Sequence, residues 1–231
     1  MPPILDFFIE IWPNLLQGYQ LTILLTFSSL AIGFVFGISL ALGRVYGNKI
    51  IKAISIGYIE VIRGTPMLVQ LFIIFYALPE INILFTPFIA AIIGFSINSA
   101  AYQAEYFRGA LQSIESGQMI AARSIGMSTT KSIRNIILPQ GLRMAIPAWS
   151  NEVIYLLKYT SLAYIIQVNE LFKVSTLIAS DTARYLETFI IIAIIYLANA
   201  TVFTEIIDRI ENKVRIPGLG AEKGGTHRGA W

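Results

Sequence analysis

Residues 19–42 decide the fold, and they read YQLTILLTFSSLAIGFVFGISLAL, without one charged side chain. A bilayer core about 30 Å thick needs roughly 20 apolar residues per helix, so this stretch is long enough to cross a membrane. Lipid offers no partner for backbone N–H and C=O groups, which is why a spanning segment of this kind must be helical. The stretch therefore predicts a transmembrane helix.

Four more apolar stretches follow, near residues 54–78, 87–108, 146–168 and 186–207. The chain of 231 residues is 55% hydrophobic and only 13% charged, with a mean hydropathy of +0.67, whereas soluble domains carry about 25% charged residues. The sequence predicts an all-α integral membrane protein with five transmembrane helices, forming one domain over residues 1–216. Because Asp6 and Glu10 precede the first apolar run and no Lys or Arg does, we expect no cleavable signal peptide.

Basic residues alternate between the two sides of the predicted spans. Thirteen of the 17 Lys and Arg residues fall in the connection between spans one and two, in the connection between spans three and four, and after span five. Cytoplasmic loops carry an excess of Lys and Arg, so the N-terminus is expected outside, the C-terminus inside and residues 109–147 in the cytoplasm. The net charge is +3, and the basic residues form no dense patch in the sequence. This argues against a nucleic-acid partner.

Composition also excludes several kinds of chemistry. The chain has no cysteine and one histidine, His227, which rules out disulfides, thiolate sites and paired-histidine metal sites. Residues 217–231 are Gly-rich and are expected to form a flexible cytoplasmic tail. Within them GAEKGGT at 220–226 lacks the phosphate-loop pattern, which requires Lys where Thr226 stands. We expect no cofactor in this chain.

Residues 109–147 predict two short amphipathic helices joined by a sharp turn. Gly126 suits the positive φ of a helix end, the hydroxyls of residues 128–130 suit capping, and Pro139 is expected to end the second helix. Two interpretations are open at this stage. The hairpin either inserts into a groove of a soluble partner or lies on the membrane as an ordinary interfacial hairpin.

Within this connection Ile120-Ala121-Ala122 and Gly126 are followed, after nine residues, by Ile136-Ile137-Leu138-Pro139. This spacing resembles the EAA motif of bacterial ABC-importer permeases, E-A-A-x-x-x-G, nine residues, then I-x-L-P. Ile120 stands where the motif has Glu, which puts the salt bridge usually expected there in doubt. The resemblance assigns coupling to an ATPase to Ala121, Ala122, Gly126, Leu138 and Pro139.

Three further segments narrow the resemblance to the polar amino acid uptake permeases, of the histidine, arginine and glutamine importer type. They are EVIRGTPMLVQLF at 60–72, AYQAEYFRG at 101–109 and LKYTSL at 157–162. In the last segment Tyr159 stands where many members have Asp, which bears on substrate range or local packing.

The resemblance implies a transmembrane subunit of an ATP-driven importer for polar amino acids, basic ones included, in the bacterial inner membrane. It implies a dimer of ATP-binding subunits that holds the ATP and Mg²⁺, a second permease chain that is identical or paralogous, and an extracytoplasmic solute-binding protein. This chain then provides the translocation path by alternating access and is not itself an enzyme.

Polar side chains inside the spans are the candidate substrate site, because an ionisable group there costs about 2.5–3.5 kcal/mol on insertion scales. In span three Asn98 and Tyr102 share a helical face, and in span four Glu152 and Tyr155 do. We expect Glu152 to bind a substrate ammonium or guanidinium group, and the Asn and Tyr side chains to bind its carboxylate. The alternative for Asn98 and Tyr102 is polar packing between helices.

Two charged residues near these faces are interpreted differently. Glu105 approaches Arg108 at the end of span three and is interpreted as structural. For Lys158 in span four a structural tie to carbonyl groups or a helix C-terminus is favoured over a substrate contact.

The second span contains Gly64-Thr65-Pro66, which predicts a break with Thr65 as the cap of a new helix start. Its free N–H groups would favour a substrate carboxylate, which makes Thr65 the fifth candidate site residue. The alternative is a proline kink with an ion pair between Glu60 and Arg63.

Two other functions stay open from the sequence alone. An integral-membrane enzyme acting on lipid phosphate groups would need clustered Asp, His or Lys residues near one interface, and the 14 acidic residues here are dispersed. A passive channel would conduct without nucleotide.

Overall fold

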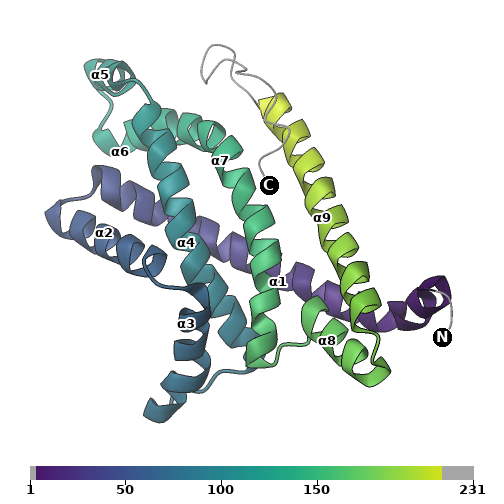
Figure 1. Cartoon of the computed structure of the whole chain (residues 1–231). Coiled ribbons are helices and arrows are strands. Elements are labelled where there is room, and N and C mark those ends of the chain that lie inside the picture. The colour runs from purple at the N-terminus through teal and green to yellow at the C-terminus, as the bar shows by residue number, and fades with distance from the viewer. Residues whose placement is uncertain (1–3, 215–231) are drawn as a thin grey trace.

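The computed structural model describes residues 4–214, and every regular element in that range is a helix (Figure 1). Four helices are long: α1 (Ile4–Tyr46), α4 (Pro87–Ser113), α7 (Leu138–Tyr159) and α9 (Tyr185–Val214). Between them lie α2 (Lys49–Arg63), α3 (Met67–Phe72), α5 (Ser116–Ser124), α6 (Thr129–Ser132) and α8 (Leu171–Thr182). The predicted all-helical class is confirmed, and the predicted tail at 217–231 lies outside the described residues.

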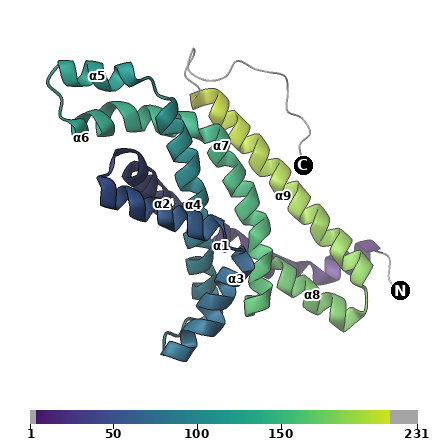
Figure 2. The ribbon, with the colours of Figure 1, turned by 60° about the vertical axis from the view of Figure 1, so that its left-hand side comes forward.

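The molecule has two distinct ends. The hairpin of α5 and α6 lies at one end together with the C-terminal end of α9, while α8 lies at the opposite end, in both views (Figures 1 and 2). The long helices connect the two ends, and α1 crosses the others obliquely (Figure 1).

Helices α1 and α4 approach each other so closely that two glycines are required. A Cβ at Gly33 would lie 2.7 Å from Nε2 of Gln103, and one at Gly37 would lie 2.9 Å from Cβ of the same residue. Small residues four apart on one face let two helix backbones come together in a membrane. This contact fixes α4, which carries one wall of the site described below.

An apolar core joins α1 to α8 and α9, through Phe7, Ile11 and Leu15 of α1 and Leu171 of α8. Helix α8 was not predicted from the sequence. Its N-terminus is fixed by two side chains: the Glu170 carboxylate accepts from the N–H groups of Phe172 and Lys173, and Thr22 Oγ1 accepts from Leu171 N–H.

The predicted break in the second apolar stretch is confirmed, since α2 ends at Arg63 and the axis bends by 101° before the helical segment Met67–Ile81. Thr65 as the cap of the new start is wrong. Pro66 occupies the N-cap position without a side-chain cap, and the Thr65 hydroxyl donates instead to the Val61 carbonyl, 2.9 Å away. The reason is that Thr65 Oγ1 lies one turn after an unpaired carbonyl at the end of α2 and satisfies it.

The connection between α4 and α7 contains the expected turn. Gly126 has φ of +86°, and the Ser128 hydroxyl caps α6 by accepting from Lys131 N–H. The expectation that Pro139 ends the second helix is wrong, because α6 continues through a π turn at Ile133–Ile137 into α7. Proline removes an N–H and clashes with the carbonyl four residues earlier. The π turn just before Pro139 relieves this conflict, with Leu138 N–H donating to the Ile133 carbonyl.

Two helices, α1 and α9, are each long and apolar enough to cross a bilayer. Two bent pairs, Lys49–Arg63 with Met67–Ile81 and Thr129–Ile166 with Leu171–Thr182, would raise the number in the described chain to four. The predicted count of five spans and the predicted orientation stay predictions.

The orientation can be tested with single cysteines, because the chain has none of its own. Ser116 on α5 and Ser180 on α8 are exposed at opposite ends of the molecule, whereas Ser175 is fully buried. We expect a membrane-impermeant thiol reagent added outside cells to label Ser180→Cys and to leave Ser116→Cys unlabelled until the membrane is permeabilised. Labelling of Ser116→Cys in intact cells would reverse the orientation.

Candidate functional site

A pocket of about 310 Å³ lies between α4 and α7. Its wall consists of three α4 residues and three α7 residues: Asn98, Tyr102 and Tyr106, and Glu152, Tyr155 and Tyr159. The structure thus brings together four of the five residues expected to bind substrate. Tyr106 was missed, although the four-residue spacing from Asn98 through Tyr102 places it on the same helical face.

Glu152 is the buried acid of this pocket, with 5% of its surface exposed. Its carboxylate accepts a hydrogen bond of 2.6 Å from the Ser99 hydroxyl, which in turn accepts from Gln103 Nε2 at 2.9 Å. Gln103 also donates to the Leu30 carbonyl of α1 and accepts from Trp149 Nε1 of α7 at 2.6 Å. This chain of polar groups ties three helices together and fixes where Glu152 lies.

A separate set of hydrogen bonds, through Gln70 of α3, holds Asn98 in place. Its Nδ2 donates to Gln70 Oε1 of α3 at 3.0 Å, and Gln70 Nε2 donates to the Ile62 carbonyl and to Thr65 Oγ1. Thr65 does not line the pocket. Gln70 links it to the pocket by donating to Thr65 Oγ1 and accepting from Asn98, so the break between α2 and α3 positions Asn98.

Two cationic side chains pack against tyrosines of the pocket. The Arg63 guanidinium lies 5.2 Å from the ring centre of Tyr102, and Lys158 Nζ lies 5.1 Å from that of Tyr155. Within residues 4–214 Lys158 makes no ion pair or side-chain hydrogen bond, so the structural tie favoured for it is absent there. Both contacts have the geometry of cation–π interactions.

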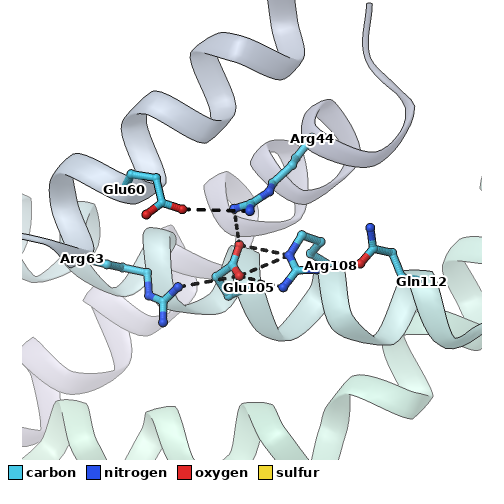
Figure 3. Close-up of polar contacts among 6 residues, drawn as sticks. All are labelled: Arg44, Glu60, Arg63, Glu105, Arg108 and Gln112. Atoms are coloured by element: carbon cyan, nitrogen blue, oxygen red, sulfur yellow. Dashed lines mark hydrogen bonds and ion pairs between the residues drawn. The ribbon is translucent and has the colours of Figure 1, made fainter.

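Glu105 is the centre of an ion cluster that joins α1, α2 and α4 (Figure 3). Its carboxylate lies 2.5 Å from Arg44, 2.8 Å from Arg108 and 3.6 Å from Arg63. This supports the structural interpretation of Glu105. The alternative ion pair between Glu60 and Arg63 is wrong, because Glu60 faces Arg44 at 4.0 Å while Arg63 faces Glu105.

The residues assigned to ATPase coupling lie away from the pocket, on and beside the hairpin of α5 and α6. Ala122 is buried, Ala121 and Gly126 are exposed, Leu138 is partly buried and Pro139 is exposed. Ile120, in the position of the motif Glu, is 64% exposed, and Ile125 beside the turn is 78% exposed. The tip of the hairpin therefore presents apolar side chains outward.

No group of three or more His, Cys, Asp or Glu side chains within residues 4–214 is arranged to hold a metal ion. The fold and the site define a helical membrane protein with a buried acid in a polar pocket and a projecting helical hairpin, which is the arrangement of a transport subunit. Residues 33–216 match the family described as binding-protein-dependent transport system inner membrane component. The chain belongs to this family, lies in the inner membrane and is not an enzyme.

Individual relatives agree with the family. The chain is 38% identical over 228 residues to the nopaline transport system permease protein NocM of Agrobacterium fabrum, covering 94% of each chain. It is 37% identical over 211 residues to the glutamine transport system permease protein GlnP of Escherichia coli K12, covering 89% of this chain and 96% of that protein. A crystal structure of an amino acid ABC transporter with histidines superposes with a TM-score of 0.84 at 36% identity, covering 92% of this chain and 99% of that chain.

The hydrogen-bond chain through Gln103 can be tested by Gln103→Leu. The substitution keeps the volume but removes the acceptor of Trp149 Nε1 and the donor to Ser99. A buried polar group left unpaired costs about 1–3 kcal/mol, so the thermal unfolding midpoint in detergent should fall. Gln112→Leu, on the exposed end of the same helix, is the control and should leave the midpoint unchanged. Equal midpoints for both variants would show that Gln103 does not stabilise the core.

Proposed function

We propose that this chain is the transmembrane subunit of an ATP-driven importer for polar amino acids, basic ones included. The observation that carries the proposal is the pocket between α4 and α7, in which a buried carboxylate faces amide and phenol groups. Its 310 Å³ is at the lower end of the range of about 300–1,000 Å³ for ligand pockets, which suits a single small solute.

Glu152 is proposed as the residue that binds the positive group of the substrate. Within residues 4–214 its hydrogen-bond donor is the neutral Ser99 hydroxyl, and no Lys or Arg forms an ion pair with it. A buried charge without a counter-charge is costly, and a substrate ammonium or guanidinium would supply that counter-charge. Asn98 and the tyrosines offer hydrogen-bond donors for the substrate carboxylate.

Tyr159 contributes an uncharged phenol to the wall of the same pocket. The resemblance to the polar amino acid uptake permeases implies Asp at this position in many members, whereas here the Tyr155 and Tyr159 rings stack with centroids 6.4 Å apart. A phenol in place of a carboxylate leaves one acid, Glu152, among the six residues of the wall. Such a pocket suits a substrate with one positive group, or a basic one whose second positive group rests on the faces of the rings.

The remaining machinery is proposed as separate chains: a dimer of ATP-binding subunits, a second permease chain that is identical or paralogous, and an extracytoplasmic solute-binding protein. The apolar tip of the α5–α6 hairpin supports docking into a groove of the ATP-binding subunit. ATP and Mg²⁺ are bound by that partner, and alternating access opens the pocket first to one side of the membrane and then to the other.

Measuring whether transport depends on ATP distinguishes the proposed importer from a passive channel. Proteoliposomes containing the assembled subunits should accumulate a labelled polar amino acid only when ATP and the ATP-binding partner are present. Equal flux without nucleotide would identify a channel. The lipid-phosphate enzyme has no support in the family comparison.

Glu152→Gln tests the site. Losing one charge-assisted contact costs about 1.5–3 kcal/mol, so the apparent affinity of the assembled transporter for its amino acid should fall by roughly ten- to a hundredfold. Expression and binding of the ATP-binding subunits should persist. Glu80→Gln, which changes an exposed acid in the turn Leu78–Ile81, is the matched control. Unchanged affinity, or failure of the variant to assemble, would make Glu152 a structural residue.

Gly126→Val tests the coupling hairpin. Gly126 has φ of +86°, which a β-branched residue strongly disfavours, while a Cβ at this position would meet no other atom within 4 Å. Substrate-stimulated ATP hydrolysis should therefore fail with valine and persist in Gly126→Asn, because asparagine tolerates positive φ. Wild-type stimulation in Gly126→Val would remove the turn from the mechanism.

A further inference from the structure

An apolar groove of about 480 Å³ runs between α1, α2 and α4, away from the pocket with Glu152. Its wall is formed by Ile32, Phe36 and Leu40 of α1, Tyr58 of α2, and Ile93 and Ile97 of α4, among others. The Tyr58 hydroxyl donates to the Ile97 carbonyl at 2.8 Å, which holds the ring in place as one side of the groove. The groove is therefore a formed feature of the fold.

Helix α2 extends this apolar surface. Ile50, Ile54 and Val61 are more than 60% exposed, and they lie on the same helical face as Tyr58. The helix also bends by 101° from the segment that follows it. An amphipathic helix that turns away from the spanning direction is suited to the boundary between headgroups and acyl chains.

Basic residues lie near the N-terminal end of α2 and in the last turn of α1. Lys49 and Lys52 of α2 are exposed and make no ion pair within the described part of the chain. On α1, Arg44 follows Ile32, Phe36 and Leu40 at the same four-residue spacing, so the groove leads toward it.

That end of the groove also carries a surplus of positive charge. The ion cluster joins Arg44, Arg63 and Arg108 to only two carboxylates, Glu60 and Glu105 (Figure 3). An apolar groove that ends at a cluster with one more arginine than carboxylates matches a molecule with an apolar chain and an anionic head.

We propose that the groove between α1, α2 and α4 is a binding site for an anionic phospholipid, with one acyl chain in the groove and the phosphate group at Lys49, Lys52 and Arg44. A second copy of this chain fits the surface less well. In a two-fold symmetric contact the same positive rim would face itself, and like charges in contact are repelled. Anionic lipids populate the cytoplasmic leaflet and attract basic residues there, which agrees with the proposed orientation of α2.

The site has a structural consequence for transport. Arg44 contacts both Glu60 of α2 and Glu105 of α4, and α4 carries Asn98 and Tyr102 into the pocket. A lipid that holds α2 at the membrane surface would therefore stabilise the helix that forms one wall of the pocket. This consequence rests on the proposed function, whereas the lipid site itself does not.

Quenching by brominated lipids tests the site. The assembled permease carrying Phe36→Trp is placed in nanodiscs, and the fluorescence of the added indole is taken as the difference from the parent chain. We expect brominated phosphatidylglycerol to quench it at a several-fold lower mole fraction than brominated phosphatidylcholine. Each basic residue near the surface is worth about fivefold, so Lys49→Gln and Lys52→Gln together remove up to about 25-fold and should abolish the preference for phosphatidylglycerol.

Arg209→Gln with Lys213→Gln is the matched control, because it removes the same charge from the end of α9 that is also expected in the cytoplasm. This pair should leave the preference for phosphatidylglycerol intact. Equal quenching by the two lipids, or an equal effect of both double substitutions, would overturn the proposal. Absence of quenching by either lipid would also overturn it and would indicate that protein covers the groove. None of these results depends on whether the transporter imports amino acids.

Discussion

The close contact of α1 and α4 at Gly33 and Gly37 is the constraint on which the candidate site depends. The Gln103 side chain fills the space beside Gly33 and Gly37, so a residue with a Cβ does not fit at either position. Gln103 then satisfies its amide with groups of three helices, and through Ser99 it determines where the Glu152 carboxylate lies. In a membrane, helices cannot rely on the hydrophobic effect to associate, so small-residue packing and buried hydrogen bonds carry this role.

Glu105 of α4 and Glu152 of α7 are buried or half-buried acids with different partners. Glu105 is surrounded by three arginines and holds α1, α2 and α4 together (Figure 3). Glu152 has a hydroxyl for its partner and faces a pocket. A carboxylate already neutralised by its own chain has little to gain from a cationic ligand, whereas one that lacks a counter-charge gains most. We therefore expect the substrate to bind at Glu152.

Much of this arrangement could be predicted from the sequence, and the failures share one physical cause. Helical periodicity alone identified the faces with Asn98 and Tyr102 and with Glu152 and Tyr155, since residues four apart lie together whatever the tertiary structure. Thr65, Pro139 and the Glu60–Arg63 pair failed because each outcome depended on a partner elsewhere: a carbonyl ending α2, a π turn, and arginines and acids on other helices. The short helix α8 was missed because Thr22 and Glu170 stabilise it, and no periodic pattern in its own 12 residues reveals that contact.

We propose that the substrate binds between α4 and α7, at Glu152. The most direct measurement is an electron cryo-microscopy structure of the assembled transporter, held in a nucleotide-free state with a saturating polar amino acid. We expect density in the pocket of Asn98, Tyr102 and Tyr155, with the positive group of the substrate within hydrogen-bond distance of the Glu152 carboxylate. Substrate density elsewhere along the path, with this pocket empty and the Ser99–Glu152 contact unchanged, would contradict it.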